Sequence, residues 1–343
     1  MSTQKPHIIL GLMAVGPEDA PGTRITSLDE FNKCLDLFQS QGFTQIDTAR
    51  VYCGGQQEAF TREAQWKERQ LQVATKWYPM GVGSHKPEVV KAKLADSLRE
   101  LGTDSIDLFY LHAADRSTPF AETFEALDEL YREGKFRRLG LSNFSAFEVA
   151  EVVTMCHARG WVRPTVYQGL YNAISRSLET ELIPCCRRYG IDVYIFNPLA
   201  GGFLSGKYKA GATPAEGRFS DKLSSQGKMY RDRYFKSSLF DKLDDLKHIA
   251  DKHGLTMVEI ALRWCVHHSA LNVNVGGGDG IITGFSSLAQ LETNLTDLQK
   301  GPLPAEVVGA LDSAWGQSQA DSNSFWHGKL QYGYDTTKVL FGA

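Results

Sequence analysis

The alternation of short β-rich runs with longer segments of helical period most constrains the fold of this chain. Several of the β-rich runs are nearly continuous apolar stretches, as expected for strands that are covered on both faces. They lie at 8–10, 43–46, 71–75, 106–111, 138–141, 165–167, 193–196 and 281–282. Amphipathic segments lie between them, at 28–40, 91–101, 119–133, 145–159, 178–189, 241–253 and 256–268. Strands that alternate with helices in this way predict parallel βαβ units.

Two observations favour a closed barrel over an open, doubly wound sheet. Polar residues directly follow the strands, and in a barrel these strand ends ring one mouth, where such enzymes keep their active site. These residues are Asp47, Lys76, His112, Asn143, Gln168 and Asn197. The chain also has no GxGxxG pattern after the first strand, which an open dinucleotide-binding sheet usually has. We therefore predict an α/β fold of the (β/α)8 TIM barrel type.

The whole chain, 1–343, is expected to form a single domain, because α/β barrels commonly use this much sequence as one. Two segments break the alternation. Residues 198–237 form a long connection after the seventh strand, and a loop of this size in a compact domain is usually functional. The tail from about 316 to 343 mixes aromatic and polar residues and is expected to pack over the barrel mouth.

Composition gives no sign of nucleic-acid or membrane binding. The net charge is −3 and the isoelectric point is near 6.3, so no basic footprint for nucleic acid or anionic lipid is visible. No secretory signal and no membrane-spanning run is found, which makes the cytoplasm the expected location. The six cysteines form no CxxC pair and are expected to be reduced. Because no Cys/His/Asp cluster has ligand spacing, no metal is expected.

Four residues at or near the strand ends could act together on a carbonyl group, namely Asp47, Tyr52, Lys76 and His112. Each alone is weak evidence, because an aspartate can cap a helix and a lone histidine is more often structural. Their shared location in consecutive βα loops is more informative. A lysine ammonium beside a tyrosine lowers the tyrosine pKa from about 10, and an aspartate can hold that lysine in place and charged. A histidine could then orient the carbonyl oxygen that the tyrosine protonates, while a hydride reaches the carbon.

The motifs around these residues occur in a known order and spacing. The segment 42–49 reads GFTQIDTA and is followed by Tyr52, and 73–76 reads VATK. The segment 107–112 reads DLFYLH, and 140–144 reads GLSNF. Together they resemble the aldo-keto reductase superfamily, and the resemblance covers nearly the whole chain.

Within that superfamily, the segments 164–169, 197–202 and 204–208 are similar to the aflatoxin-dialdehyde and succinic-semialdehyde reductase branch. The resemblance implies that the chain reduces aldehydes or ketones to alcohols, with NADPH as its cofactor. A small carbonyl compound would be the substrate.

The resemblance also implies roles for individual residues. Tyr52 would be the general acid, Lys76 would lower its pKa and pair with Asp47, and His112 would bind the carbonyl oxygen. Phe196 would stack on the nicotinamide ring, where the family usually has tyrosine. The cofactor would contact Ser142, Asn143 and Gln168 at its carboxamide, Leu199, Gly201, Leu204 and Lys207 along its pyrophosphate, Arg218, Ser286, Gln290 and Asn294 at its adenosine end, and also Asn197.

The adenosine end determines the choice between NADPH and NADH. A 2′-phosphate needs cationic and hydrogen-bonding partners, which Arg218 and its neighbours would supply, and this favours NADPH. The alternative for Lys207 and Arg218 is that both are solvated loop charges.

The tail departs from this branch. Related reductases usually end in a short tail with an arginine that can bind a substrate carboxylate. This chain reads SFWH at 324–327 and continues to Ala343, and no arginine follows Arg263. We therefore expect larger, less acidic carbonyl compounds to be preferred over succinic semialdehyde. The expected substrate-binding residues are Met13, Trp77, Arg231 and Trp326.

Two other functions stay open at this point. A narrow biosynthetic reductase of one specialised metabolite would share the chemistry of a broad detoxifying reductase. A cofactor-binding regulatory subunit with little turnover, like the channel-associated β subunits of this fold, would retain the four catalytic residues too. The likeness of 172–173 and the 198–219 loop to working reductases favours an enzyme. Relatives in this branch are often dimers, so a homodimer also stays open.

Overall fold

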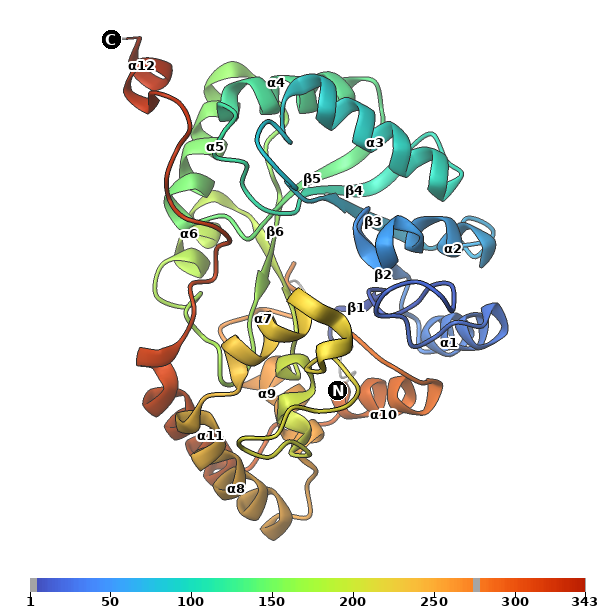
Figure 1. Ribbon diagram of the computed structural model, residues 1–343, viewed down its shortest axis with the longest axis vertical. Coiled ribbons are helices and arrows are strands. Elements are labelled where there is room, and N and C mark those ends of the chain that lie inside the picture. Colours follow the sequence, from blue (N-terminus) through green and yellow to red (C-terminus); the bar gives the residue numbers. More distant parts are fainter. Residues whose placement is uncertain (1–4, 274–277, 343) are drawn as a thin grey trace.

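The computed structural model describes residues 5–273 and 278–342, and its centre is a closed barrel of parallel strands (Figure 1). The strands are β1 (Ile8–Gly11), β2 (Gln45–Asp47), β3 (Gln72–Trp77), β4 (Ile106–Leu111), β5 (Phe136–Ser142), β6 (Val166–Leu170), β7 (Asp192–Phe196) and β8 (Gly280–Thr283). Each strand pairs with the next along the chain, and β8 pairs with β1, where Ile281 lies opposite Ile8. The predicted (β/α)8 barrel is confirmed.

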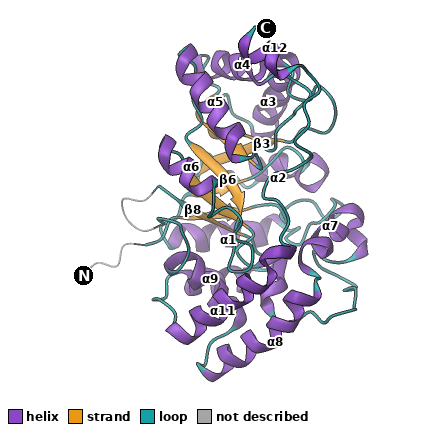
Figure 2. Ribbon diagram, turned by 90° about the vertical axis from the view of Figure 1, so that its left-hand side faces the viewer, coloured by secondary structure: helices purple, strands orange, loops and turns teal. Residues whose placement is uncertain are grey.

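Helices surround the strands on all sides, as Figure 1 and Figure 2 show. They are α1 (Leu28–Ser40), α2 (Gln57–Glu63), α3 (Pro87–Leu101), α4 (Phe120–Arg132), α5 (Ala146–Arg159), α6 (Leu182–Tyr189), α8 (Ser237–Lys252), α9 (Met257–His267), α10 (Leu288–Leu298) and α11 (Ala305–Ser318). Helix α1 begins where an N-cap is expected, because the Ser27 side chain accepts a hydrogen bond from the Glu30 amide. Helix α5 has a full capping box between Ser145 and Glu148.

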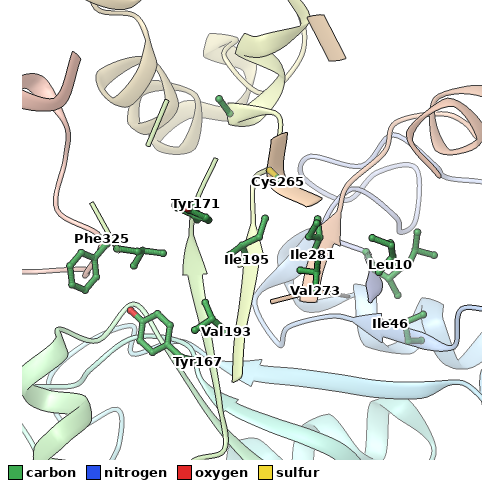
Figure 3. Close-up of a cluster of buried hydrophobic side chains, with 14 of the residues drawn as sticks. Leu10, Ile46, Tyr167, Tyr171, Val193, Ile195, Cys265, Val273, Ile281 and Phe325 are labelled. Atoms are coloured by element: carbon green, nitrogen blue, oxygen red, sulfur yellow. The ribbon is translucent and has the colours of Figure 1, made fainter. Parts of the chain in front are cut away.

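Successive residues of each strand face opposite sides of the barrel wall. The inward side chains fill the barrel, and they are Ile9, Ala74, Leu108, Tyr110, Val166, Tyr194 and Ile282. The outward side chains pack against the helices, and Figure 3 shows Leu10, Ile46, Tyr167, Val193, Ile195 and Ile281 among them. Lys76 and Gln168 each lie two residues after an inward position, so they belong to the inward set and point toward the barrel mouth.

A glycine in β5 makes room for a tyrosine ring in the barrel interior. A β-carbon at Gly140 would lie only 2.2 Å from a ring carbon of Tyr110, so no other residue type fits there without displacing that ring. Tyr110 is fully buried in the barrel interior. Its ring therefore fills the layer directly below the mouth.

The long connection after β7 has secondary structure of its own. It contains the 3₁₀ turns η2 (Ala200–Ser205) and η3 (Asp221–Leu223) and the helix α7 (Ser224–Tyr234). The chain turns sharply at the start of η2, where Ala200, Gly201 and Gly202 have φ values of 52°, 70° and 96°. Figure 2 shows α7 to one side of the strands, and in Figure 1 it lies in front of them, so this connection lies over one end of the barrel.

The tail after α11 follows the outside of the barrel. It contains η4 (Gln319–Asp321), passes α6 and α5, and ends in α12 (Thr336–Phe341) (Figure 1). On the way, the His327 amide donates to the carbonyl oxygen of Asn143, and the Gly333 amide donates to that of Arg116. Arg116 and Asn143 lie just after β4 and β5, so the tail reaches the rim of the barrel mouth beside these two strands.

Candidate active site

The four predicted catalytic residues meet at the barrel mouth. Asp47 ends β2, Lys76 lies in β3, His112 follows β4, and Tyr52 begins the 3₁₀ turn η1 (Tyr52–Gly55). The Lys76 ammonium donates to Asp47 Oδ1 at 2.5 Å, to the Thr48 carbonyl oxygen at 2.7 Å and to the Tyr52 hydroxyl at 3.1 Å. The sequence prediction of a Lys–Asp pair beside a tyrosine therefore agrees with this geometry.

Lys76 is completely buried, and its contacts compensate for the loss of water. Burial alone would lower the pKa of Lys76, but the oxygens of Asp47 and Tyr52 outweigh burial and raise it. Asp47 Oδ2 accepts a second hydrogen bond, from Gln168 Nε2 at 2.8 Å. The pair is therefore held as an ammonium and a carboxylate, because an unpaired buried charge would be far more costly.

Tyr52 differs from expectation in the direction of its pKa. The sequence led us to expect a lowered pKa, but loss of water contact raises the pKa of Tyr52, and the opposing effect of Lys76 is smaller. The hydroxyl is therefore protonated near pH 7 and can serve as an acid. Lys76 remains the group that stabilises the phenolate once the proton has left.

His112 lies between two tyrosine rings. The ring centroids are 6.0 Å apart for Tyr52 and 5.4 Å apart for Tyr78, both in edge-to-face geometry. Burial lowers the pKa of His112 well below its usual value, and Lys76 and His327 act in the same direction. The imidazole is therefore neutral and has one N–H to donate.

The residues predicted to hold the nicotinamide carboxamide lie beside this group. Asn143 Nδ2 donates to the His112 carbonyl oxygen and to Ser142 Oγ, each at 2.9 Å. Asn143 Oδ1 is buried and has no partner in residues 5–273 and 278–342. Gln168 already donates to Asp47. Phe196 packs against the side chains that fill the barrel, so its ring faces inward as a stacking surface requires.

The residues predicted to line the pyrophosphate lie in the connection that follows β7. The Asn197 side chain accepts a hydrogen bond from the Gly201 amide and donates to the Tyr234 hydroxyl, so Asn197 holds the turn together. Leu204 is buried and Leu199 half-buried, which leaves mainly backbone groups to face a ligand. Lys207 is exposed and lies over the Tyr208 ring.

The residues predicted for the adenosine end form two groups. Ser286 and Gln290 bond to each other at the start of α10, and the buried Asn294 donates to the Gly284 carbonyl oxygen. Asn294 Oδ1 has no partner in the described part of the chain. Arg218 instead lies against Met13 and Tyr230, and its Nη1 is 3.1 Å from Met13 Sδ and 3.1 Å from the Tyr230 hydroxyl.

The predicted substrate-binding residues differ in where they point. Met13 contacts Arg218. Trp77 packs in the hydrophobic core outside the barrel, where its indole N–H donates to the Ser84 carbonyl oxygen at 2.9 Å. Arg231 donates to the Phe219 carbonyl oxygen and pairs with Asp221 at 2.5 Å. Trp326 packs edge-to-face on Phe325. Their roles in binding a substrate stay predictions.

Sequence reasoning missed two residues beside His112, namely Tyr78 and His327. Tyr78 could have been found, because it lies two residues after Lys76 and therefore faces the same way, whereas Trp77 faces the opposite way. His327 carries no local signal, since it reaches the site only through the path of the tail. Its Nδ1 lies 3.3 Å from the Tyr78 hydroxyl.

The described residues provide neither a metal site nor a membrane-spanning helix. Across residues 5–273 and 278–342, no group of three or more His, Cys, Asp and Glu side chains could hold a metal ion. In the same ranges, no helix combines the length and apolar character that crossing a bilayer requires.

Comparison with known proteins identifies the family. The model of the aldo/keto reductase family matches residues 7–316. An aldo-keto reductase of Pseudocercospora fijiensis is 44% identical over 287 residues, which cover 82% of this chain and 96% of that protein. Human aldo-keto reductase family 7 member A3 is 42% identical over 328 residues, with 92% and 95% covered. Aflatoxin B1 aldehyde reductase member 2 of Rattus norvegicus is 41% identical over 324 residues, with 91% and 85% covered. The chain therefore belongs to the aldo/keto reductase family and is an oxidoreductase, and this membership implies NAD(P)H-dependent reduction of small carbonyl compounds.

Proposed function

We propose that the protein reduces aldehydes and ketones to alcohols with NADPH, and that Tyr52 is the general acid. The observation that carries the proposal is the position of the Tyr52 hydroxyl, 3.1 Å from an ammonium group that is itself completely buried and paired with Asp47. A buried tyrosine beside a fixed ammonium can release its proton, because the resulting phenolate is stabilised at once.

The chain's own residues bind and orient the carbonyl and supply the proton. When bound, NADPH supplies the hydride that adds to the carbonyl carbon. The Tyr52 hydroxyl gives its proton to the carbonyl oxygen, which becomes the alcohol, and Lys76 stabilises the phenolate that remains. The neutral His112 donates a hydrogen bond that fixes the carbonyl oxygen beside Tyr52.

Two unpartnered side-chain atoms support the fit of a dinucleotide. Asn143 Oδ1 at the end of β5 and Asn294 Oδ1 in α10 are buried acceptors without a partner among the described residues. A carboxamide would satisfy the first and an adenine amino group the second, and buried polar groups usually have such partners. Arg218, which forms no ion pair in residues 5–273 and 278–342, would provide the cation for a 2′-phosphate.

The proposed substrates are larger carbonyl compounds without a carboxylate. The tail has His327 where a cationic side chain would be needed for an acidic substrate, and Arg231 is already paired with Asp221. One relative is named for the reduction of aflatoxin B1 aldehyde, which supports a bulky aldehyde here as well. A broad detoxifying role and a narrow biosynthetic one would share this chemistry.

The test is the oxidation of NADPH in the presence of succinic semialdehyde, carboxybenzaldehyde, nitrobenzaldehyde and phenanthrenequinone, with wild type and Tyr52→Phe. We expect turnover of the uncharged compounds to exceed that of the acids. In the variant we expect turnover to fall by about 100-fold or more, with NADPH binding retained. Equal activity of both proteins would remove Tyr52 from the mechanism. Tight NADPH binding without turnover of any compound would favour a regulatory subunit or a narrow biosynthetic enzyme.

A further inference from the structure

Tyr52 lies on an irregular turn and not on a strand of the barrel. In this turn, η1, the residues Cys53, Gly54 and Gly55 have φ values of 51°, 64° and 89°, so three successive residues are in the left-handed region. A residue with a β-carbon, such as Cys53, adopts that region only at a cost in free energy. Such a conformation persists only where neighbouring segments hold it. The position of the Tyr52 hydroxyl therefore depends on what holds the turn.

The Arg50 side chain holds the end of this turn. One of its nitrogens, Nη1, donates to the Gly55 carbonyl oxygen at 2.6 Å and to Glu58 Oε2 at 3.2 Å. The backbone amide of Arg50 donates to the Lys76 carbonyl oxygen at 3.0 Å. Arg50 therefore connects the last residue of the turn that carries the hydroxyl with the strand that carries the ammonium.

Glu58, in the first turn of α2, attaches the same segment to the barrel wall. Its side chain is completely buried, and its Oε1 accepts a hydrogen bond from Thr75 Oγ1 at 2.6 Å. Thr75 precedes Lys76 in β3, so it faces the helices while Lys76 faces the barrel interior. Burial raises the pKa of Glu58, and the hydrogen bonds from Thr75 and Ser97 oppose that rise. The charge of Arg50 opposes it too, and without Arg50 the buried carboxylate would lack its counter-charge.

We propose that Arg50 and Glu58 are positioning residues that hold the Tyr52 hydroxyl in place beside the buried ammonium. We call this pair the turn brace, and the inference rests on the proposed donation of a proton by Tyr52. In residues 5–273 and 278–342, neither side chain is hydrogen-bonded to Tyr52 or to the Lys76 ammonium, so the brace acts through the shape of the turn. The attraction between an ammonium and a developing phenolate falls with distance, and a misplacement of about 1 Å can cost about 100-fold in rate.

The experiment measures a single turnover, in which nitrobenzaldehyde oxidises the NADPH already bound to the protein. The rate is expressed per bound NADPH, so misfolded protein does not lower it. Arg50→Met removes both contacts of Nη1, and it should lower this rate about tenfold, with the KM for the aldehyde and the Kd for NADPH unchanged. Arg50→Lys should lower it only about threefold, because one ammonium can make both contacts from a slightly shorter side chain.

A second ion pair of similar burial provides the matched control. Arg187 Nη1 donates to Asp279 Oδ1 at 2.8 Å, and Asp279 directly precedes β8, at the opposite end of the barrel from Tyr52. Asp279 is as buried as Glu58, and the arginine of each pair is partly exposed. Arg187→Met should therefore leave the single-turnover rate at the wild-type level. An equal fall in both methionine variants would overturn the proposal, because loss of any such ion pair would then suffice.

Glu58 is tested together with Arg50. Glu58→Gln keeps the shape of the side chain and removes the charge that Arg50 contacts, and it should lower the single-turnover rate about fivefold. Because the two residues form one contact, the double variant with Arg50→Met should be no slower than Arg50→Met alone. Effects that multiply would show that each residue acts by itself, which contradicts the brace.

A second double variant tests whether the brace acts through Tyr52. Tyr52→Phe has no hydroxyl to position, so adding Arg50→Met should lower its rate no further. Another tenfold fall would overturn the positioning role, and so would a wild-type rate in Arg50→Met alone. The proposed function would fail by a different result, namely no oxidation of NADPH by the wild type, or equal rates in the wild type and Tyr52→Phe.

Discussion

Gln168 Nε2 donates a hydrogen bond to Asp47 Oδ2 at 2.8 Å, across the barrel from β6 to β2. Lys76 takes the other carboxylate oxygen. Both carboxylate oxygens of the buried Asp47 therefore have a hydrogen-bond partner. The carboxylate in turn holds the Lys76 ammonium within hydrogen-bond distance of the Tyr52 hydroxyl. Gln168 on β6 and Lys76 on β3 together hold the Asp47 carboxylate, and Lys76 in turn contacts Tyr52, the proposed general acid. The Asp47–Lys76 pair is therefore the first target for substitution.

Asp47→Asn should impair both stability and turnover. The amide keeps the shape of the carboxylate but leaves the Lys76 ammonium buried without its counter-charge, which should cost about 3 kcal/mol of unfolding free energy. Turnover should fall by about 100-fold, because Lys76 can no longer be held charged beside Tyr52. Urea unfolding and NADPH oxidation measure the two effects.

An ion pair at the opposite end of the barrel gives the control for this substitution. Asp107 is the second residue of β4, its Oδ2 lies 2.5 Å from Arg138 Nη2, and both side chains are partly exposed. Asp107→Asn should cost about 1 kcal/mol or less and leave turnover at the wild-type level. Equal losses of activity in the two variants would show that Asp47 matters only for stability.

Gly140→Ala should destabilise the barrel although it adds only one methyl group. The new carbon would lie 2.2 Å from one ring carbon of Tyr110 and 2.4 Å from another, so the ring has to move within a packed interior. Such overpacking should cost about 2 kcal/mol in unfolding free energy. Gly309→Ala in α11 meets nothing within 4 Å and should instead stabilise the protein by about 0.5 kcal/mol. An unchanged free energy of unfolding in Gly140→Ala would show that the Tyr110 ring has room to shift.

The fold could be predicted because its signal is local and repeated. Each apolar run predicts a strand and each amphipathic segment predicts a helix. Eight predicted strands with a helix between most of them leave few possible topologies. The proposed catalytic residues could be brought together for the same reason, since the ends of parallel strands meet at one mouth. Side chains alternate between the two faces of a strand, so the sequence also predicts which residues near a strand end face the same way. This alternation would have placed Tyr78, and not Trp77, on the same side as Lys76.

The individual contacts of the tail could not be predicted in the same way. Arg116 and Glu148 are 32 residues apart, and the His327 carbonyl oxygen that Arg116 bonds is 211 residues away, so no periodicity connects them. The direction of the Tyr52 pKa was unpredictable too, because it depends on how strongly the folded chain excludes water from the hydroxyl. Both depend on long-range packing, which a sequence pattern does not express.

Stability should fall as the pH is lowered from about 6.5 to about 4. Burial, with Arg233 and Arg116, lowers the pKa of His327 to about 4, and burial also lowers that of His85 to about 4. Between these values and the unfolded value near 6.5, the unfolded chain binds more protons than the folded chain, so unfolding becomes easier as the pH falls. Urea unfolding at a series of pH values should show a smaller slope for His327→Phe. An unchanged slope would mean that the pKa of His327 is the same in the folded and the unfolded protein.

Arg218→Gln should weaken the binding of NADPH and leave that of NADH unchanged. In the described residues Arg218 bonds to Tyr230 and Met13 and to no carboxylate, so its charge remains available for a 2′-phosphate. Loss of that charge-assisted contact should raise the Kd for NADPH by about tenfold, measured by quenching of protein fluorescence. Lys222→Gln is the control, since Lys222 is an exposed cation of the same loop that lies 3.6 Å from Glu216. Equal weakening of NADPH and NADH would assign Arg218 to the shape of the loop, and no weakening of either would make it a solvated charge.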